Sequence, residues 1–169
     1  MTQGNRSFAM TPLSNGQTIE RFYDFGDFEI NSPLPIAKSD TSRLFFWAGP
    51  KGLSLVTIHD KADDGTGGAA SLDLAGLPTS VGEWVVRDDD TGNDDYSDDG
   101  TDPDWKWSGR RTDGGAYRGG LTGETITITP AFNEAADKNI YDPGRIRRWE
   151  FVTGQATDPR NVSMDLDEP

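Results

Sequence analysis

The densest group of residues able to do chemistry is a run of aspartates near the middle of the chain. Nine of the seventeen residues 88–104 are aspartate, and none is glutamate. Carboxylates this close together repel one another, so the run is either a solvated acidic loop or a segment whose oxygens converge on cations. Calcium suits such a loop, because it takes six to eight oxygen ligands and short Asp side chains supply them on a tight turn.

A more specific pattern inside this run has the form of a DxSxDG calcium loop. Its alternating oxygen donors and the glycine that follows them are Asp95, Ser97, Asp99 and Gly100. Alternate spacing turns successive oxygens inward, and the glycine permits the sharp turn that brings the carbonyl of Thr101 into the shell. An EF-hand would place a bidentate Glu where this chain has Lys106, so Asp102, Asp104 or residues elsewhere must complete any site.

Two tryptophans and one histidine offer other chemistry. Trp105 and Trp107 are two residues apart, so on a strand their rings share one face, which could stack on a sugar ring or be buried as core. His59, the single histidine, is followed by Asp60, but neighbours on a strand point to opposite faces. Since no GxSxG elbow, P-loop or dinucleotide fingerprint accompanies them, we expect His59 at a rim and no enzymatic function.

Strands are predicted to carry most of these residues, because the dominant hydrophobic period is two. The runs begin at Thr18, Ser42, Gly52, Ser71, Gly82, Asp104, Thr125, Arg145 and Asn161. Residues 44–47 and 53–58 are apolar on both faces, which indicates central strands. Glycine-rich stretches such as 63–68 and 112–120 are predicted turns, and a stretch after Pro130 favours a short helix. We expect an all-β fold, an antiparallel β-sandwich or jelly roll of about ten short strands.

Length and charge limit the possible functions. A chain of 169 residues suffices for one core, so we expect a single domain at 18–169 after an N-terminal arm at 1–17 that has no signal-peptide character. The net charge of −13, with 22 Asp against 7 Glu, is typical of proteins that stay soluble in molar salt, where repulsion is screened within about 3 Å. Without a basic stripe or a long apolar run, we expect no nucleic-acid binding and no membrane insertion.

Several motifs, taken in order, resemble a β-sandwich domain of secreted or surface proteins, particularly of haloarchaea. They lie within residues 42–166 and read GLSLVTIHDKADDGTGGAASLDLAGLP, GEWVVRDDD, WKWSGRRTDGGAYRGGL, TITITPAF and RRWEFVTG. The resemblance implies a non-catalytic, metal-stabilised extracellular fold. In that pattern the acidic turn after GEWVVRDDD recurs together with the TDGG turn at 112–115, which nominates Asp88, Asp90 and Asp113 as further metal ligands.

A virus particle reconciles a surface-type fold with the lack of an export signal, because its proteins are made in the host cytoplasm and leave when the particle is released. We therefore expect a non-enzymatic, calcium-stabilised structural protein of a haloarchaeal virus, such as a capsid decoration, turret, spike or tail-fibre component. Its partners would be further copies of itself, docked by the arm, other virion proteins and a host surface glycan. The alternative is an extracellular carbohydrate-binding or adhesion module of a halophile's cell surface, with Trp105 and Trp107 on the glycan.

Overall fold

The computed structural model describes residues 1–23, 36–88, 92–139 and 145–169. These residues form twelve strands, one short α-helix and one 3-10 helix. In chain order they are β1 (Thr2–Gln3), β2 (Arg6–Ser7), α1 (Ile19–Tyr23), β3 (Thr41–Gly49), β4 (Gly52–His59), β5 (Gly68–Ala75), β6 (Glu83–Arg87), β7 (Asp95–Tyr96), β8 (Pro103–Trp107), β9 (Asp113–Arg118), β10 (Thr127–Phe132), η1 (Asn133–Ala135), β11 (Arg148–Gln155) and β12 (Asp158–Met164). The prediction of an all-β fold is confirmed.

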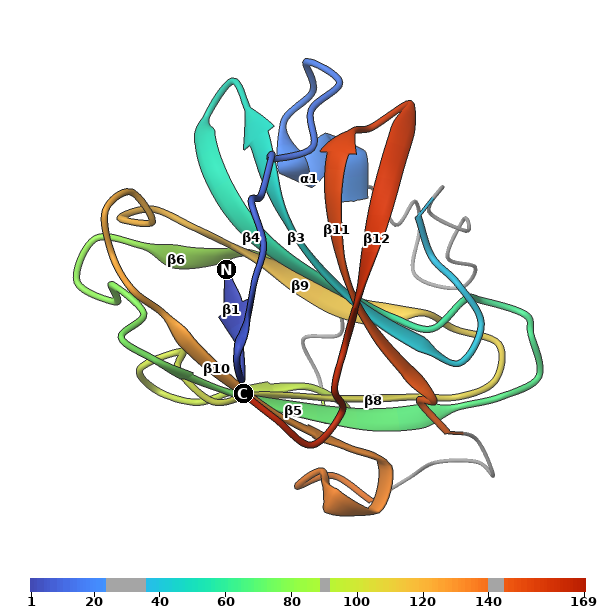
Figure 1. The fold of residues 1–169 in the computed structure, drawn as a ribbon. Helices are drawn as coiled ribbons and strands as arrows, with labels where there is room; N and C mark the ends of the chain where they lie inside the picture. The colour runs from blue at the N-terminus through green and yellow to red at the C-terminus, as the bar shows by residue number, and fades with distance from the viewer. Residues whose placement is uncertain (24–35, 89–91, 140–144) are drawn as a thin grey trace.

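Two sheets pack face to face as a β-sandwich (Figure 1). The larger sheet has the strand order β12-β11-β3-β4-β9-β6, the smaller has the order β10-β5-β8-β7, and β1 and β2 form a separate pair. Neighbouring strands are antiparallel except β11 and β3, which are parallel. The prediction of central strands at 44–47 and 53–58 is confirmed, because β3 and β4 lie inside the larger sheet.

Two local predictions are wrong. The run that begins at Thr18 is helix α1 rather than a strand. The glycine-rich stretch predicted as a turn contains β9, which pairs with both β4 and β6. At Gly114 a Cβ atom would lie 2.2 Å from the Thr57 carbonyl oxygen and 2.7 Å from the Tyr23 hydroxyl. Glycine therefore serves here to let the backbone approach its neighbours closely, rather than to end a strand.

Apolar side chains cover both faces of the larger sheet. The cluster between the two sheets includes Leu44, Leu72, Trp84, Trp105, Trp107, Trp149 and Phe151. A second cluster, on the opposite face of the larger sheet, joins Phe45, Trp47, Val56 and Ile58 to Leu13, Ile19, Tyr23 and Ile36. This double coverage explains why β3 and β4 are apolar on both faces, since each strand directs alternate side chains to each cluster.

The first seventeen residues lie against the sandwich, whereas the sequence suggested an extended arm. Gln3 is buried, donates to the carbonyls of Asp165 and Glu168, and accepts from the Asp165 N–H. Leu13 is buried beside Trp47, with which it forms a parallel bridge. In this structure the segment is therefore packed as part of the domain.

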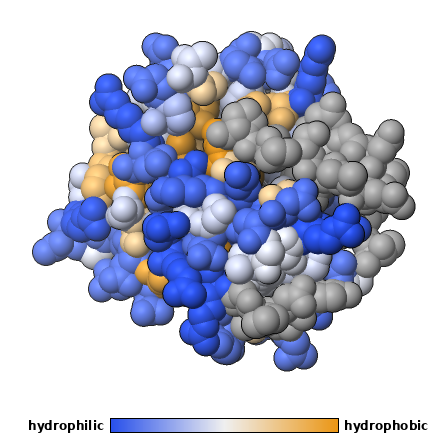
Figure 2. All heavy atoms as spheres, turned by 90° about the vertical axis from the view of Figure 1, so that its right-hand side faces the viewer, coloured by the Kyte–Doolittle hydropathy of each residue, from blue (hydrophilic) through white to orange (hydrophobic). Residues whose placement is uncertain are grey.

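The face drawn in Figure 2 is mostly hydrophilic, with limited hydrophobic areas between charged and polar residues. Among the described residues, Val81 is the one large hydrophobic side chain that is exposed, at 68 %. Neither helix in the described ranges is long and apolar enough to cross a bilayer.

Candidate metal centre

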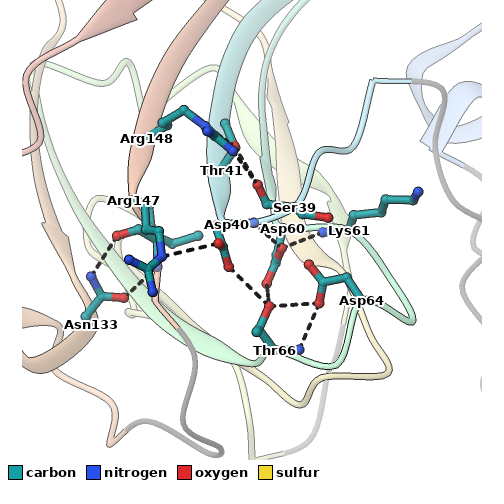
Figure 3. Close-up of polar contacts among 11 residues, drawn as sticks. Ser39, Asp40, Thr41, Asp60, Lys61, Asp64, Thr66, Asn133, Arg147 and Arg148 are labelled. Carbon is teal, nitrogen blue, oxygen red and sulfur yellow. Dashed lines mark hydrogen bonds and ion pairs between the residues drawn. The ribbon is translucent and has the colours of Figure 1, made fainter.

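Three aspartates, one from the segment before β3 and two from the connection after β4, meet at one end of the β3–β4 pair (Figure 3). Asp40 precedes β3, Asp60 follows β4, and Asp64 lies in the connection to β5. Because Ser42 faces His59 in the antiparallel register, the start of β3 lies beside the end of β4. One carboxylate oxygen of each aspartate lies within 4.8 Å of the others, and no other such group of three occurs in the part of the chain that the structure describes.

The backbone around the site is left-handed at three aspartates. The φ angles are +53° at Asp40, +65° at Asp60 and +60° at Asp63. Asp adopts this region more readily than most residues because its short side chain can bond locally. At Asp60 the turn directs the carboxylate towards Trp107, on whose ring His59 also stacks. Asp60 and His59 thus both contact the same tryptophan, contrary to what strand alternation predicts.

Asp60 is only 1 % exposed, and the structure provides a donor for each of its oxygens. Its Oδ1 accepts the backbone N–H groups of Asp40 and Lys61, both at 2.8 Å. Its Oδ2 accepts the indole N–H of Trp107 at 3.1 Å. Trp107 belongs to β8 in the smaller sheet, so this carboxylate ties the two sheets together while its burial is compensated by hydrogen bonds.

The hydroxyl of Thr66 lies among the three carboxylates. Its Oγ1 is 2.8 Å from an oxygen of Asp64, 3.3 Å from one of Asp40 and 3.5 Å from one of Asp60. A hydroxyl carries one proton and can satisfy one of these acceptors at a time. The three carboxylates therefore share this one hydroxyl proton, and a cation bound among them would compensate their charge in a way that the single proton cannot.

Charge is unevenly distributed over the three carboxyls. Burial raises the pKa of Asp60 to about 7, although the hydrogen bond from Trp107 opposes this. For Asp64, partial burial also acts to raise the pKa, but the backbone and hydroxyl of Thr66 outweigh it and the pKa falls below its usual value. Asp40 is paired with Arg147, whose exposed Nε lies 3.3 Å from it. Neighbouring carboxyls that titrate apart are typical of groups sharing a proton, which a cation would displace.

The donors of this site fit a hard metal ion. They are three carboxylates and one hydroxyl, all oxygen, with no sulfur or imidazole among them. Oxygen donors of this type suit hard cations such as calcium, magnesium or manganese rather than zinc or copper. We conclude that Asp40, Asp60 and Asp64 could hold a metal ion.

The DxSxDG run closes on itself instead. The hydroxyls of Ser97 and Thr101 both donate to Oδ1 of Asp99, at 3.0 and 2.8 Å, and the Asp102 N–H donates to the Ser97 hydroxyl at 3.2 Å. The Thr101 carbonyl, expected as a metal ligand, accepts the Leu74 N–H at 2.9 Å. Oδ1 of Asp99, the Ser97 hydroxyl and the Thr101 carbonyl are thus engaged in the turn and in its contact with β5.

The remaining predicted ligands are divided between two places. Asp95 and Asp104 are opposite each other on β7 and β8, and burial raises the pKa of Asp104. Asp88 and Asp113 lie near Tyr23, whose pKa is raised first by burial and then by these and other nearby charges. The two turns linked by the resemblance are therefore close in space. Asp90 lies outside the described residues.

The burial of His59, Trp105 and Trp107 tests the predictions of a rim histidine and of a tryptophan pair that stacks on a sugar. His59 is fully buried, with its Nδ1 2.9 Å from the Ser42 hydroxyl, so the prediction of a rim histidine is wrong. Its ring lies beside the rings of Trp105 and Trp107 in the core, where burial lowers its pKa to about 3 and keeps it neutral. Trp105 and Trp107 are 0 % and 2 % exposed, so their rings are not free to stack on a glycan.

The metal cluster itself was missed at the level of sequence. The available signal was DKADDG directly after an apolar strand, a stretch in which Asp60 and Asp64 already lie close together. Asp40 is twenty residues from Asp60 along the chain, and their contact depends on the register of the β3–β4 hairpin. The composition of DKADDG is typical of a turn and does not indicate a site, because the cluster forms only when β3 and β4 pair in this register.

Comparisons of the chain with protein-family models, with curated proteins and with solved structures give no match.

Proposed function

We propose that the chain is a non-enzymatic structural protein whose β-sandwich is stabilised by calcium bound at Asp40, Asp60 and Asp64. The observation that carries this proposal is the convergence of the three carboxylates within 4.8 Å at a point where Asp60 also bonds Trp107 of the opposite sheet. An ion held there would fix the beginning of β3, the end of β4 and, through Trp107, the smaller sheet. Its effect would be mechanical and thermodynamic rather than chemical.

Calcium fits this site better than magnesium does. Calcium accepts six to eight oxygens in irregular geometry, whereas magnesium demands a near-ideal octahedron and keeps most of its waters. Here the ligands come from two connections, one before β3 and one after β4, and they range from the buried Asp60 to the partly exposed Asp40 and Asp64. Water can complete the coordination shell on the exposed side, so the site can reach the higher coordination number that calcium takes.

The setting we propose is a haloarchaeal virus particle. A net charge of −13 with a hydrophilic surface suits molar salt, and a calcium-tied sandwich suits a particle that must persist outside a cell. The partners would be further copies of the chain and other particle proteins. The glycan-binding alternative loses its support, because Trp105 and Trp107, which carried it, lie in the core.

Thermal unfolding in about 2 M KCl, titrated with calcium chloride and then with a chelator, tests the metal site. An ion that binds the folded state alone stabilises it by about 2.7 kcal/mol at a hundredfold excess over its Kd, so the midpoint should rise by about 5–11 °C and return on chelation. Magnesium at the same concentration should give a smaller shift. A midpoint that does not respond to calcium would refute the proposed site.

Neighbouring aspartates provide a matched pair of variants. Asp64→Asn removes a cluster oxygen and should abolish the calcium response, whereas Asp63→Asn makes the same change at an exposed position one residue away and should preserve it. Asp99→Asn tests the DxSxDG turn in the same assay. A response lost in Asp99→Asn and kept in Asp64→Asn would move the calcium site to that turn.

The particle role has a separate test. Mass spectrometry of particles released by a culture that carries the gene should find the chain at a stoichiometry comparable to that of other particle proteins. Detection in the cell extract alone would refute this role and leave the calcium result unaffected.

A further inference from the structure

The N-terminal segment fills a slot in the larger sheet. β3 and β11 pair in parallel as far as Phe45 and Val152. Farther along, residues 11–13 lie between the two strands, and the segment can be followed in blue in Figure 1 from the N-terminus. The sheet is thus completed by a piece of chain from near the terminus.

Backbone hydrogen bonds hold this segment on both sides. Towards β3, the Leu13 N–H donates to the Phe46 carbonyl at 2.7 Å, and the Leu13 carbonyl accepts the Ala48 N–H at 2.8 Å. Towards β11, the Gly154 N–H donates to the Thr11 carbonyl at 3.1 Å. Main-chain contacts of this kind are the basis of strand addition to a sheet, in which affinity comes from the ladder and specificity from the buried side chains.

Leu13 supplies the specificity. Its side chain is 0 % exposed and packs in the same cluster as Phe45, Trp47 and Val152. A single buried leucine at the centre of a short inserted segment acts as an anchor, while its neighbours Pro12 and Ser14 are partly or wholly exposed. Any chain that enters the slot must therefore present an apolar residue at this position.

The connection from the segment to the rest of the domain runs over the surface. Residues 14–16 are exposed, and Gly16 has a φ of +82° with open space around it. Asn15 and Gln17 bond each other across this turn. A surface turn with a glycine can change its backbone direction without disturbing buried contacts, as a hinge requires.

Charge sets the N-terminal segment apart from the remainder of the chain. Residues 1–19 contain Arg6 and no carboxylate, whereas all 29 acidic residues lie between Glu20 and the C-terminus. Two acidic domains repel each other, but a segment with positive charge is attracted to the acidic domain of another copy. The charge pattern therefore favours contact through this segment over contact between the domains themselves.

The strand edges offer no equal route for pairing among the described residues. Pro130 lies within the edge strand β10, and Pro159 lies within the edge strand β12. Neither proline can donate a backbone hydrogen bond to a further strand. The edge strand β6 carries an irregularity between Trp84 and Val86, and β7 has two residues. Prolines, bulges and short strands are devices that prevent edge-to-edge association.

The N-terminal hairpin covers its apolar surface loosely. Met1, Thr2 of β1 and the residues after β2 border a groove of about 630 Å³, which Phe46, Leu121, Ile128 and Phe151 also line. Space of this size under the hairpin means that its side chains make fewer contacts than a close-packed interior would give. Release of the hairpin therefore breaks few close apolar contacts at this groove, and its buried polar contacts are those of Gln3 with Asp165 and Glu168.

We propose that the N-terminal segment of one copy of this chain enters the slot between β3 and β11 of a second copy, in place of that copy's own segment. The contacts formed are the same as those in the single chain, so exchange needs no new surface. Reciprocal exchange gives a closed dimer, and exchange in one direction links copies into a row. The exchange rests on the structural role proposed above and would supply its self-assembly.

Engineered cysteines test the exchange directly, because the chain contains no cysteine of its own. The hydroxyl of Thr153 bonds both the N–H and the carbonyl of Thr11, at 2.7 and 3.0 Å, so these two positions mark the segment and the slot. The variants Thr11→Cys and Thr153→Cys, one of them enlarged by a tag, are mixed in molar KCl and oxidised. If the segment of one copy occupies the slot of the other, the two thiols are held together and the disulfide between the different chains forms in excess of the background from chance collision.

We expect at least a severalfold excess of this mixed disulfide over a control in which Thr11→Cys is mixed with Thr122→Cys, at an exposed loop position. Adding Leu13→Asp to the Thr11→Cys chain should reduce the product to the control level. Mixed disulfide at the control level, while the double variant Thr11→Cys/Thr153→Cys closes within one chain, would refute the exchange. A double variant that closes neither within nor between chains would refute the slot itself. Neither result depends on calcium or on a particle, so either can fail without the other proposals.

Discussion

The two acidic regions of this protein differ in how their carboxylates are held. In the DxSxDG turn, Asp99 is fully exposed and accepts hydrogen bonds from residues within two positions of itself along the chain. In the metal cluster, Asp60 is buried and accepts from Asp40, twenty residues away, and from Trp107, forty-seven residues away. The DxSxDG turn has the higher density of charge, whereas the metal cluster is held by residues that are farther apart in the sequence.

This difference shows that density of carboxylates is a poor guide to a binding site. Neighbouring aspartates in an exposed loop can turn away from one another and be hydrated or capped by nearby hydroxyls, as Asp99 is by Ser97 and Thr101. Carboxylates fixed by distant parts of the fold cannot turn away. Their repulsion remains until a proton or a cation neutralises it.

The largest expected effect is on stability when one carboxylate of each region is removed. Asp60→Ala leaves the buried indole N–H of Trp107 and the partly buried N–H groups of Asp40 and Lys61 without their acceptor, and the loss of a buried partner costs about 1–3 kcal/mol. After relief of repulsion in the cluster, we expect a net loss of about 3 kcal/mol in the free energy of unfolding. Asp99→Ala should leave the denaturation midpoint unchanged, because its side chain is exposed.

Urea denaturation in molar salt with chelator present measures both variants on one scale. Equal, small losses in the free energy of unfolding for Asp60→Ala and Asp99→Ala would mean that the two regions do not differ in how their carboxylates are held. A stabilised Asp60→Ala would mean that repulsion among the metal-free carboxylates outweighs the three hydrogen bonds, which would make the cation a necessity for folding rather than an addition.

The sandwich could be predicted from the sequence where the apolar pattern is clear, as in the continuously apolar β3 and β4 and the alternating β8. Two failures have identifiable causes. In α1, Ile19 and Tyr23 are spaced for a helix and Thr18 caps the Arg21 N–H at 3.3 Å, but the aromatic content of this run favours a strand. In β9, Gly114 is selected by close backbone packing, which no local pattern reveals.

The candidate site was less predictable than the fold. Asp60 and Asp64 lie close together in the sequence, within a stretch that is predicted to be a turn. No local pattern indicates that Asp40 lies beside them, since this contact arises from the register of the β3–β4 hairpin. His59 illustrates the same limit. A polar residue at a strand end is expected at the rim, and only the inward turn at Asp60 and the stacking on Trp107 place it in the core.

The dependence of stability on pH offers a smaller effect that separates the regions. Asp60 has a folded pKa of about 7 against about 3.9 when unfolded, so between these values the folded state alone holds the proton. In the absence of metal, this group's contribution is therefore fully present below about pH 4 and is lost as pH rises to about 7, by at most about 1.4 kcal/mol per unit.

Calcium should cancel this loss, because the bound ion takes the place of the proton. Urea denaturation between about pH 4.5 and 7.5, with chelator and with saturating calcium, should thus give a falling curve and a flatter one. Asp99→Asn should leave both curves unchanged, since hydrogen bonds from Thr101 lower the pKa of Asp99 and move its titration below this range. Parallel curves with and without calcium would place the ion away from Asp60.

The smallest expected effect concerns Arg147, whose guanidinium is paired with Asp40 at the exposed side of the cluster. This pair competes with a metal ion for the same carboxylate, so Arg147→Gln should raise calcium affinity by roughly twofold to fivefold, the range that an exposed ion pair supports. Arg145→Gln is the matched control, because Arg145 pairs with Glu134 outside the cluster. Calorimetric titration at two KCl concentrations should show the gain shrinking as salt screens the pair. A loss of affinity in Arg147→Gln would mean that Arg147 holds Asp40 in position for the ion, and the cluster would then depend on its exposed side as much as on the buried Asp60.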